Sequence, residues 1–295
     1  MFIMKSSKLV QKINEKLNKL SNKKSVQLLN KTLYIFSTHD MKIYSGYATL
    51  YILMAIPPLL MLIINIVNRI PSLTAQDFSE QFMKFIPELP QVQALLDDVI
   101  VNLNNQSSDL VLSFSAITTL WSASLGVTAM QEGLNHINES NRPSVYGKPL
   151  AILFTILFVL LIPSLLVFQL LRNPIVNVVG SILNFLKIPN GAEWFKSFME
   201  TSSIISVIVL IIAILMTYTY LPYGKRSIKS QIPGAVIGFV IAAVFTWGFS
   251  LFMGTFWSNS AIYGSLAAIF LSALWLKTAM SIFFLGACYN KARES

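Results

Sequence analysis

Six long apolar segments, separated by more polar ones, organise this chain. An α-helix that rises about 1.5 Å per residue needs roughly 20 mostly apolar residues to cross the hydrocarbon core of a bilayer. One run, AIYGSLAAIFLSALWLKTAMSIFFLGACY at 261–289, also contains many small residues that let neighbouring helices pack closely. The pattern predicts an all-α membrane protein, a bundle of six transmembrane helices at about residues 44–67, 110–131, 149–171, 202–221, 232–254 and 261–288.

Prolines predict kinks in two of these helices and the end of one. A proline inside a helix lacks the backbone N–H and pushes against the preceding turn, so Pro57 with Pro58 and Pro163 are expected to bend their helices. Pro174 is predicted to end the third helix and to leave 175–188 as a short interfacial or re-entrant segment. The second helix is rich in Ser and Thr, so we expect it to line the bundle interior or a wet cavity.

The six predicted crossings form a transmembrane domain at residues 41–290. Two segments that are not crossings, one before this domain and one in a loop of it, also have helical periodicity. Residues 5–31, within a basic cytoplasmic segment 1–40, place apolar side chains on one face and are rich in lysine. This pattern predicts an amphipathic helix that lies on the membrane and binds anionic phospholipid; a solvated tail that only sets the orientation remains the alternative. Residues 75–105 are acidic and are expected to form a helical loop outside the cell membrane.

Composition and charge support a membrane protein and exclude several partners. Charged residues are 12% of the 295 residues, about half their share in soluble domains, while 54% are hydrophobic. Most of the net charge of +9 falls in segments that six crossings place inside, so both termini are expected in the cytoplasm. No aromatic residues interleave with the N-terminal lysines to stack bases, so no nucleic-acid partner is expected. With one cysteine, no metal-ligand cluster and no phosphate-binding G-x-x-x-x-G-K-[ST] motif, we expect no disulfide, metal, cofactor or ATP coupling.

Lys277 is the one charged residue within the sixth apolar run. A cation in mid-membrane costs about 3 kcal/mol on insertion scales and usually has a function. We expect it to contact an anionic head group or substrate; the alternatives are snorkelling of the side chain and hydrogen bonds to backbone carbonyls. The cavity walls of this candidate substrate site are expected to be Tyr51, Trp121, Ser122, Ser124 and Tyr263.

Five stretches in a fixed order carry a resemblance to a known family. They are YSGYATLYILMAIPPLL, LWSAS with MQEGLNHINESNRP, YTYLP, IPGAVIGFVIAAVFTWGFSLFM, and AIYGSLAAIFLSALWL with FLGACYN. Over about residues 40–290 the chain resembles the YihY/BrkB family of bacterial inner-membrane proteins, which carry the label "ribonuclease BN-like". Its sixth helix usually ends Gly-Ala-Glu-Leu-Asn, whereas here Cys288 and Tyr289 stand where that family has Glu-Leu.

The function expected from these features is transport or flipping of an amphipathic, anionic envelope lipid or glycolipid. A polar second helix, kinked helices and an intramembrane cation favour it. A non-catalytic scaffold or regulator of cell-envelope assembly is the alternative. A ribonuclease would need a base, a metal or a cation cluster at one scissile bond, and His39 and His136 have no partner motif, so no enzyme is expected.

Overall fold

A computed structural model describes residues 24–67, 109–140, 147–200, 202–224, 226–253 and 264–294. The described residues are helical, with short turns and no strand. The helices are α2 (Lys24–Thr38), α3 (Met41–Val67), α6 (Asp109–Ile137), α7 (Gly147–Phe185), α8 (Gly191–Glu200), α9 (Ser202–Tyr220), α10 (Ile228–Phe252) and α11 (Gly264–Glu294).

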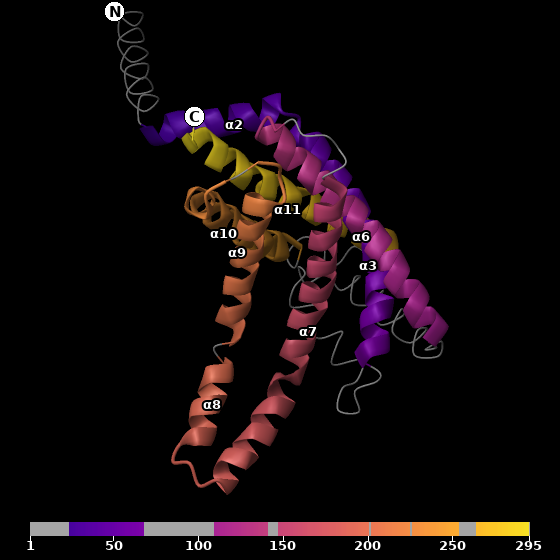
Figure 1. The fold of residues 1–295 in the computed structure, drawn as a ribbon, viewed down its shortest axis with the longest axis vertical. Helices are drawn as coiled ribbons and strands as arrows, with labels where there is room; N and C mark the ends of the chain where they lie inside the picture. Colours follow the sequence, from indigo (N-terminus) through magenta and orange to yellow (C-terminus); the bar gives the residue numbers. More distant parts are fainter. Residues whose placement is uncertain are drawn as a thin grey trace, which may run out of the picture.

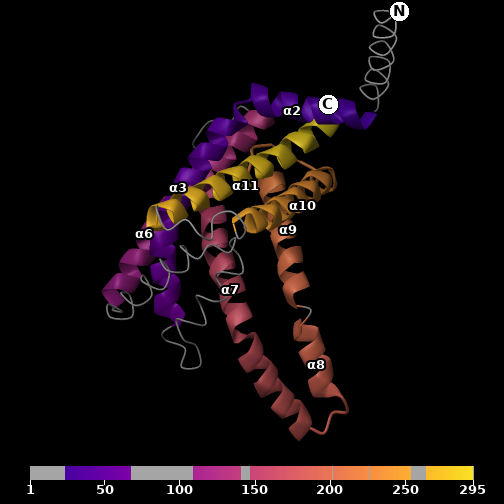
Figure 2. The same cartoon turned by 180° about the vertical axis from the view of Figure 1, so that it is seen from behind.

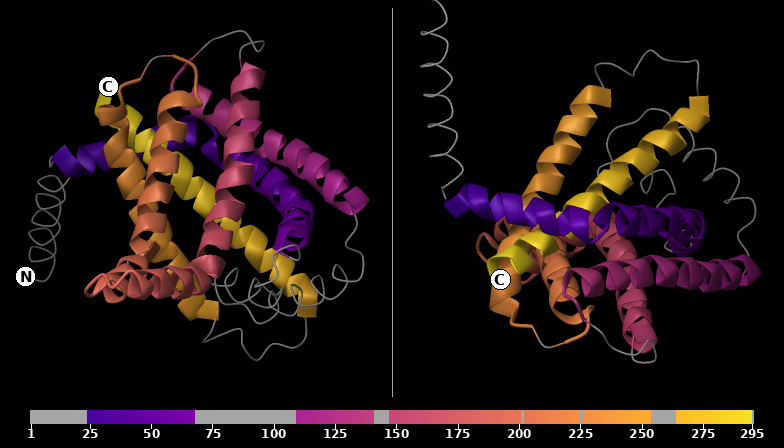
Figure 3. Two further views of the ribbon diagram at one scale, coloured as in Figure 1. Left: turned by 60° about the horizontal axis from the view of Figure 1, so that its bottom comes forward. Right: turned by 90° about the horizontal axis from the view of Figure 1, so that it is seen from above.

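The helices form two groups that meet at one end of the molecule. Figure 1 shows α3 and α6 side by side, while α7 runs away from them and returns through α8 and α9 as a long hairpin. Seen from behind in Figure 2, α10 lies against α11, and α11 crosses the middle of the molecule. Figure 3 shows α2 lying across α11 close to the C-terminus. The chain end, α2 and the first residues of α10 therefore share the end at which the two groups are joined.

Among the described residues, four helices are long and apolar enough to cross a membrane. These candidate spans are Met41–Asn65, Leu112–Ile137, Ile228–Phe252 and Ile269–Glu294. Shorter apolar stretches, Pro149–Leu161 and Ile204–Tyr220, stand where the third and fourth crossings are expected. The predicted all-helical fold is thus confirmed for the part of the chain that the structure describes, and the count of six crossings stays a prediction.

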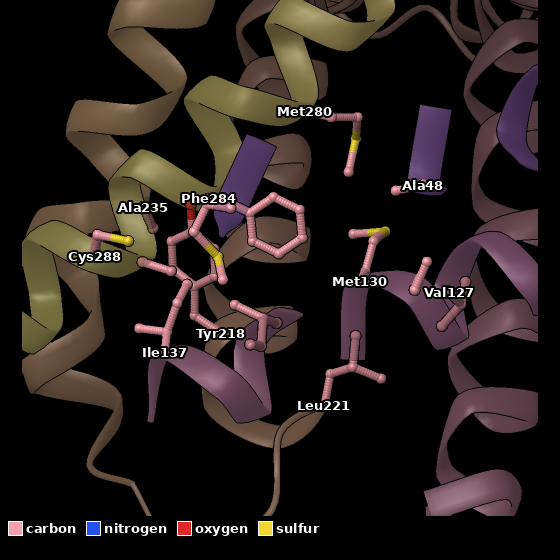
Figure 4. Packing of buried hydrophobic residues seen from close by; sticks show 14 of the residues in the cluster. Ala48, Val127, Met130, Ile137, Tyr218, Leu221, Ala235, Met280, Phe284 and Cys288 are labelled. Carbon is pink, nitrogen blue, oxygen red and sulfur yellow. The ribbon is translucent and has the colours of Figure 1, made fainter. Parts of the chain in front are cut away.

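The main hydrophobic core is formed by residues of α2, α3, α6, α7, α9, α10 and α11. Figure 4 shows its centre, where Phe284 and Met280 of α11 meet Met130 and Val127 of α6 and Ala48 of α3. A second, smaller cluster joins Phe249 and Met253, at the end of α10, to Leu271 of α11. In contrast, buried residues make up only 17–33% of the four span windows, so most of the apolar helix surface faces outward, as it does in a protein surrounded by lipid.

The prediction that Pro174 ends the third helix is wrong, because α7 continues through Pro163 and Pro174 to Phe185. A proline inside a helix costs about 3 kcal/mol. An end at this point, between the apolar stretches 149–161 and 175–185, would instead leave several backbone groups without partners in apolar surroundings, at several kcal/mol each. At about 58 Å, the 39-residue α7 is longer than the roughly 30 Å hydrocarbon core.

Other helix ends differ from the predicted crossings by up to six residues, and α6 runs on to Ile137. α10 starts at Ile228, so Pro233 lies inside it, and α11 runs on to Glu294. α3 also continues through Pro57 and Pro58, and the kinks expected at the prolines stay predictions. Most of the predicted amphipathic helix 5–31 and all of the loop 75–105 lie outside the described residues.

Candidate functional site

Lys277 lies near the middle of α11, and its side chain is exposed. The first and last residues of α11, Gly264 and Glu294, are about 20 and 26 Å away along the helix axis, farther than a lysine side chain reaches. The backbone carbonyl of Lys277 accepts a hydrogen bond from Ser281 Oγ at 2.9 Å. The structure therefore places a charged group on the surface of a candidate membrane span, Ile269–Glu294.

The other predicted site residues are spread over α3 and α6. Tyr51 is half-buried and packs against the main core, as does Leu276, the residue before Lys277. Trp121 is 70% exposed, and its backbone carbonyl accepts a hydrogen bond from Ser124 Oγ at 2.7 Å. Ser122 and Ser124 are half-buried on α6, and Tyr263 lies outside the described residues. Trp121 thus points outward rather than into an enclosed cavity, and a substrate role for this set stays a prediction.

Hydrogen-bonded polar side chains, four of them buried, gather instead at the joined end of the bundle, where α6 and α11 end and α9 passes into α10. We call this set the polar junction. It consists of Gln131, Asn135, Ser140, Tyr218, Arg226, Gln231, Asn290 and Glu294.

One half of the polar junction fixes the turn after α9 to the end of α6. Gln131 donates from Nε2 to the carbonyl of Leu221 at 2.8 Å, and the Tyr223 N–H donates to Asn135 Oδ1 at 2.7 Å. Ser140 Oγ, just beyond α6, donates to the carbonyl of Tyr223 at 3.0 Å. All three side chains thus bind backbone N–H or carbonyl groups of the turn. These backbone groups lie beyond the end of α9 and have no hydrogen-bond partner within a helix.

The other half joins α10 to α11 through the side-chain amide of Asn290. Its Oδ1 accepts from the Gly234 N–H at 2.7 Å, and its Nδ2 donates to the backbone carbonyl and to Oε1 of Gln231, each at 3.0 Å. Gln231 Nε2 donates in turn to Glu294 Oε1 at 3.1 Å. The buried Asn290 amide thus makes three hydrogen bonds, which use most of the hydrogen-bonding capacity of its oxygen and nitrogen.

Two glycines bring the backbones of these helices together. A Cβ on Gly234 would lie 2.2 Å from the carbonyl oxygen of Gly286, and one on Gly286 would lie 2.6 Å from the Gly234 carbonyl oxygen and 2.6 Å from the Tyr218 hydroxyl. Tyr218 is itself buried and donates to the carbonyl of Phe283. Only hydrogen at both glycine positions allows this approach of α10, α11 and α9, a packing device common between membrane helices.

Arg226 brings a cation to the edge of the polar junction. Its Nη2 donates to Ser140 Oγ at 3.1 Å, while Nη1 is buried and has no hydrogen-bond partner in the described part of the chain. Burial lowers the pKa of the guanidinium, and the nearby Glu294 carboxylate acts in the opposite direction. Because an arginine stays protonated in proteins, the group remains a cation at neutral pH.

The contacts described in the polar junction bind and position its side chains and the helix ends. Its amides and hydroxyls bind one another or backbone groups, which stabilises the helix ends. Nearby, His136 Nδ1 lies 3.2 Å from the His39 carbonyl, and His39 Nε2 lies 3.9 Å from Glu139 Oε1. Within the ranges that the structure describes, no group of three or more His, Cys, Asp or Glu residues could hold a metal ion.

Several residues of the polar junction lie within motifs that carry the family resemblance, but those motifs do not by themselves predict it. Gln131 and Asn135 belong to MQEGLNHINES, and Asn290 ends FLGACYN. The available signal was an isolated amide at the end of an otherwise apolar helix, which must find partners when it is buried.

Comparison with known proteins agrees with the membrane fold. The family model described as Virulence factor BrkB matches residues 32–295. The chain is 28% identical over 268 residues to the "ribonuclease-like protein YfkH" of Bacillus subtilis, covering 86% of this chain and 90% of that protein. It is 26% identical to a UPF0761 membrane protein of Aggregatibacter aphrophilus (85% and 86% covered) and 22% identical to one of Aeromonas salmonicida (84% and 83%). No solved structure matches the chain. Since the family model covers most of the chain, including every residue of the polar junction, the chain belongs to the BrkB family of membrane proteins.

Proposed function

We propose that this membrane protein moves an amphipathic, anionic envelope lipid or glycolipid across the bacterial inner membrane, with both of its termini in the cytoplasm. The observation that carries the proposal is the exposed side chain of Lys277, about 20 Å from the nearer end of α11. A charge at such a depth is costly unless it meets water or an anion.

The surroundings of Lys277 suit a passing head group better than a permanent ion pair. Its neighbours on α11 include the hydroxyls of Thr278 and Ser281, which bond to carbonyls of their own helix and still have acceptor capacity. Neutral hydroxyls and one cation provide weak sites for a phosphate or carboxylate, and weak sites permit release as well as binding.

The "ribonuclease-like" name of the Bacillus subtilis relative does not favour a second function here. Attack on an RNA phosphodiester needs a nucleophile, a base or a metal centre beside one bond. The described histidines lie at the surface end of α6 and in the turn before α3, where His39 contacts Glu139.

The test is lipid movement in vesicles. We would reconstitute the full chain into vesicles of phosphatidylethanolamine and phosphatidylglycerol with a trace of fluorescent phosphatidylglycerol, and then measure how much label an external reductant quenches. Transport raises the quenched share above the outer-leaflet share of protein-free vesicles. Lys277→Met should abolish this rise, whereas Lys196→Met, which removes an exposed lysine of α8, should preserve it.

Two outcomes would contradict the proposal. One is quenching equal to that of protein-free vesicles for the unmodified chain. The other is undiminished movement in Lys277→Met. Fluorescent phosphatidylcholine, which has no net charge, should move more slowly than phosphatidylglycerol if the lysine selects for anions.

A further inference from the structure

The antiparallel helices α3 and α6 pack with a repeat of seven residues. A Cβ on Gly133 would lie 3.0 Å from Tyr44 Cβ, and one on Gly126 would lie 3.1 Å from Ile52 Cγ1 and 3.7 Å from Tyr51 Cβ. Seven residues are close to two helical turns, so positions seven apart share one face of a helix. Continuing both repeats by seven residues places position 119 of α6 opposite position 58 of α3.

Thr119 is therefore the residue that faces the proline pair. It is 0% exposed, and its Oγ1 has no hydrogen-bond partner in the described part of the chain. Two other threonines of these helices behave differently. Thr49 donates to the Ser45 carbonyl at 2.6 Å, and Thr118 donates to the Phe114 carbonyl at 2.7 Å. The Thr119 hydroxyl is a buried donor without an acceptor, which destabilises the fold if nothing binds it.

The proline pair leaves the matching acceptors on α3. In a helix the N–H of residue i bonds the carbonyl of residue i−4, and positions 57 and 58 have no N–H. The carbonyls of Leu53 and Met54 thus lose their helical donors within a candidate membrane span, where no bulk water replaces them. Because a carbonyl points along the helix toward the residue four positions later, the Met54 carbonyl is directed toward the level of Pro58 and Thr119.

We infer that a single ordered water binds between α3 and α6 at this level and bridges Thr119 Oγ1 to the Leu53 and Met54 carbonyls. The donor count favours water over a cation. One hydroxyl hydrogen needs an acceptor and two carbonyls need donors, and a water supplies one acceptor and two donors. A metal ion would satisfy the carbonyls but leave the hydroxyl hydrogen unbound. The site is independent of the proposed transport and of Lys277.

The test uses the sign of a stability change. Thr119→Val keeps the shape and removes the hydroxyl. If the water is bound, the variant breaks the bridge, and the melting temperature of the purified full chain should fall by about 2–4 °C. If the hydroxyl has no partner, its removal relieves a buried unsatisfied group and the melting temperature should stay equal or rise. Thr118→Val is the control, since its hydroxyl bonds its own helix, and it should change the value less.

A second variant connects the effect to the proline pair. Pro58→Ala returns an N–H to the Met54 carbonyl, so Thr119→Val should cost less in this background than in the unmodified chain. Equal costs would overturn the bridge. Melting temperatures should also agree in sodium, potassium and choline chloride at one ionic strength; stabilisation by sodium that disappears in Thr119→Val would show a cation in place of the water and would overturn the inference.

Discussion

Gly234→Ala should be one of the most damaging small substitutions in the chain. The added Cβ would lie 2.2 Å from the Gly286 carbonyl oxygen and 2.4 Å from Asn290 Nδ2. The first of these atoms belongs to a backbone, so the substitution can be accommodated only by moving α10 away from α11. That movement also pulls the Gly234 N–H from Asn290 Oδ1, now at 2.7 Å.

The magnitude follows from three effects. Overpacking costs about 1–3 kcal/mol, and a buried amide left without its partners costs about 1–3 kcal/mol more. Replacing Gly by Ala inside a helix returns about 1 kcal/mol. The expected net loss in the free energy of unfolding is therefore about 1–5 kcal/mol, which corresponds to a clear drop in melting temperature for a chain of this size.

The assay is thermal unfolding of the detergent-purified chain, followed by size-exclusion chromatography after heating. Gly248→Ala is the matched control, because it lies in the same helix and nothing lies within 4 Å of its added Cβ. Gly238→Ala, whose Cβ would lie 3.4 Å from the Tyr218 hydroxyl, should fall between the two. If Gly234→Ala proved as stable as Gly248→Ala, the close approach of α10 and α11 through the two glycines would be refuted.

Two further predictions concern the membrane. With Cys288→Ala to remove the buried thiol, a new cysteine beside Asp97 should react with an impermeant maleimide from outside intact cells; labelling only after the cells are opened would contradict two cytoplasmic termini. A peptide of residues 5–31 should float with vesicles that contain phosphatidylglycerol, less so as salt is added, and should not bind RNA sequence-selectively; binding that ignores lipid charge would disprove an electrostatic membrane anchor.

The helices of this chain could be predicted well because their cause is local. A run of apolar residues long enough to cross a bilayer can be recognised in the sequence alone. Accordingly, α3, α9 and α10 begin within a few residues of their predicted starts. Pro174 misled the prediction because the local rule, that proline ends a helix, competes with the cost of unpaired backbone in apolar surroundings.

The polar junction could not be predicted, because its partners are far apart in the sequence. Gln131 bonds a carbonyl 90 residues away, and Asn290 bonds Gln231 at a separation of 59. Periodicity shows which face of a helix is buried but not which helix covers it. The same limit explains Trp121, which was expected in a cavity wall and is 70% exposed. Lys277 was expected at mid-helix and lies there, since that position depends on helix length alone.

The contact between the end of α6 and the turn after α9 limits which of its residues can vary in sequence. Gln131, Asn135 and Ser140 hold this turn through main-chain atoms of Leu221 and Tyr223, which every residue type except proline can offer at those positions. The half-buried Tyr223 can therefore change its side chain while its docking is retained, whereas Leu221 is also held by burial in the main core. Divergence between homologues should therefore affect Tyr223 before it affects Leu221 or the three α6-end positions that supply the side chains.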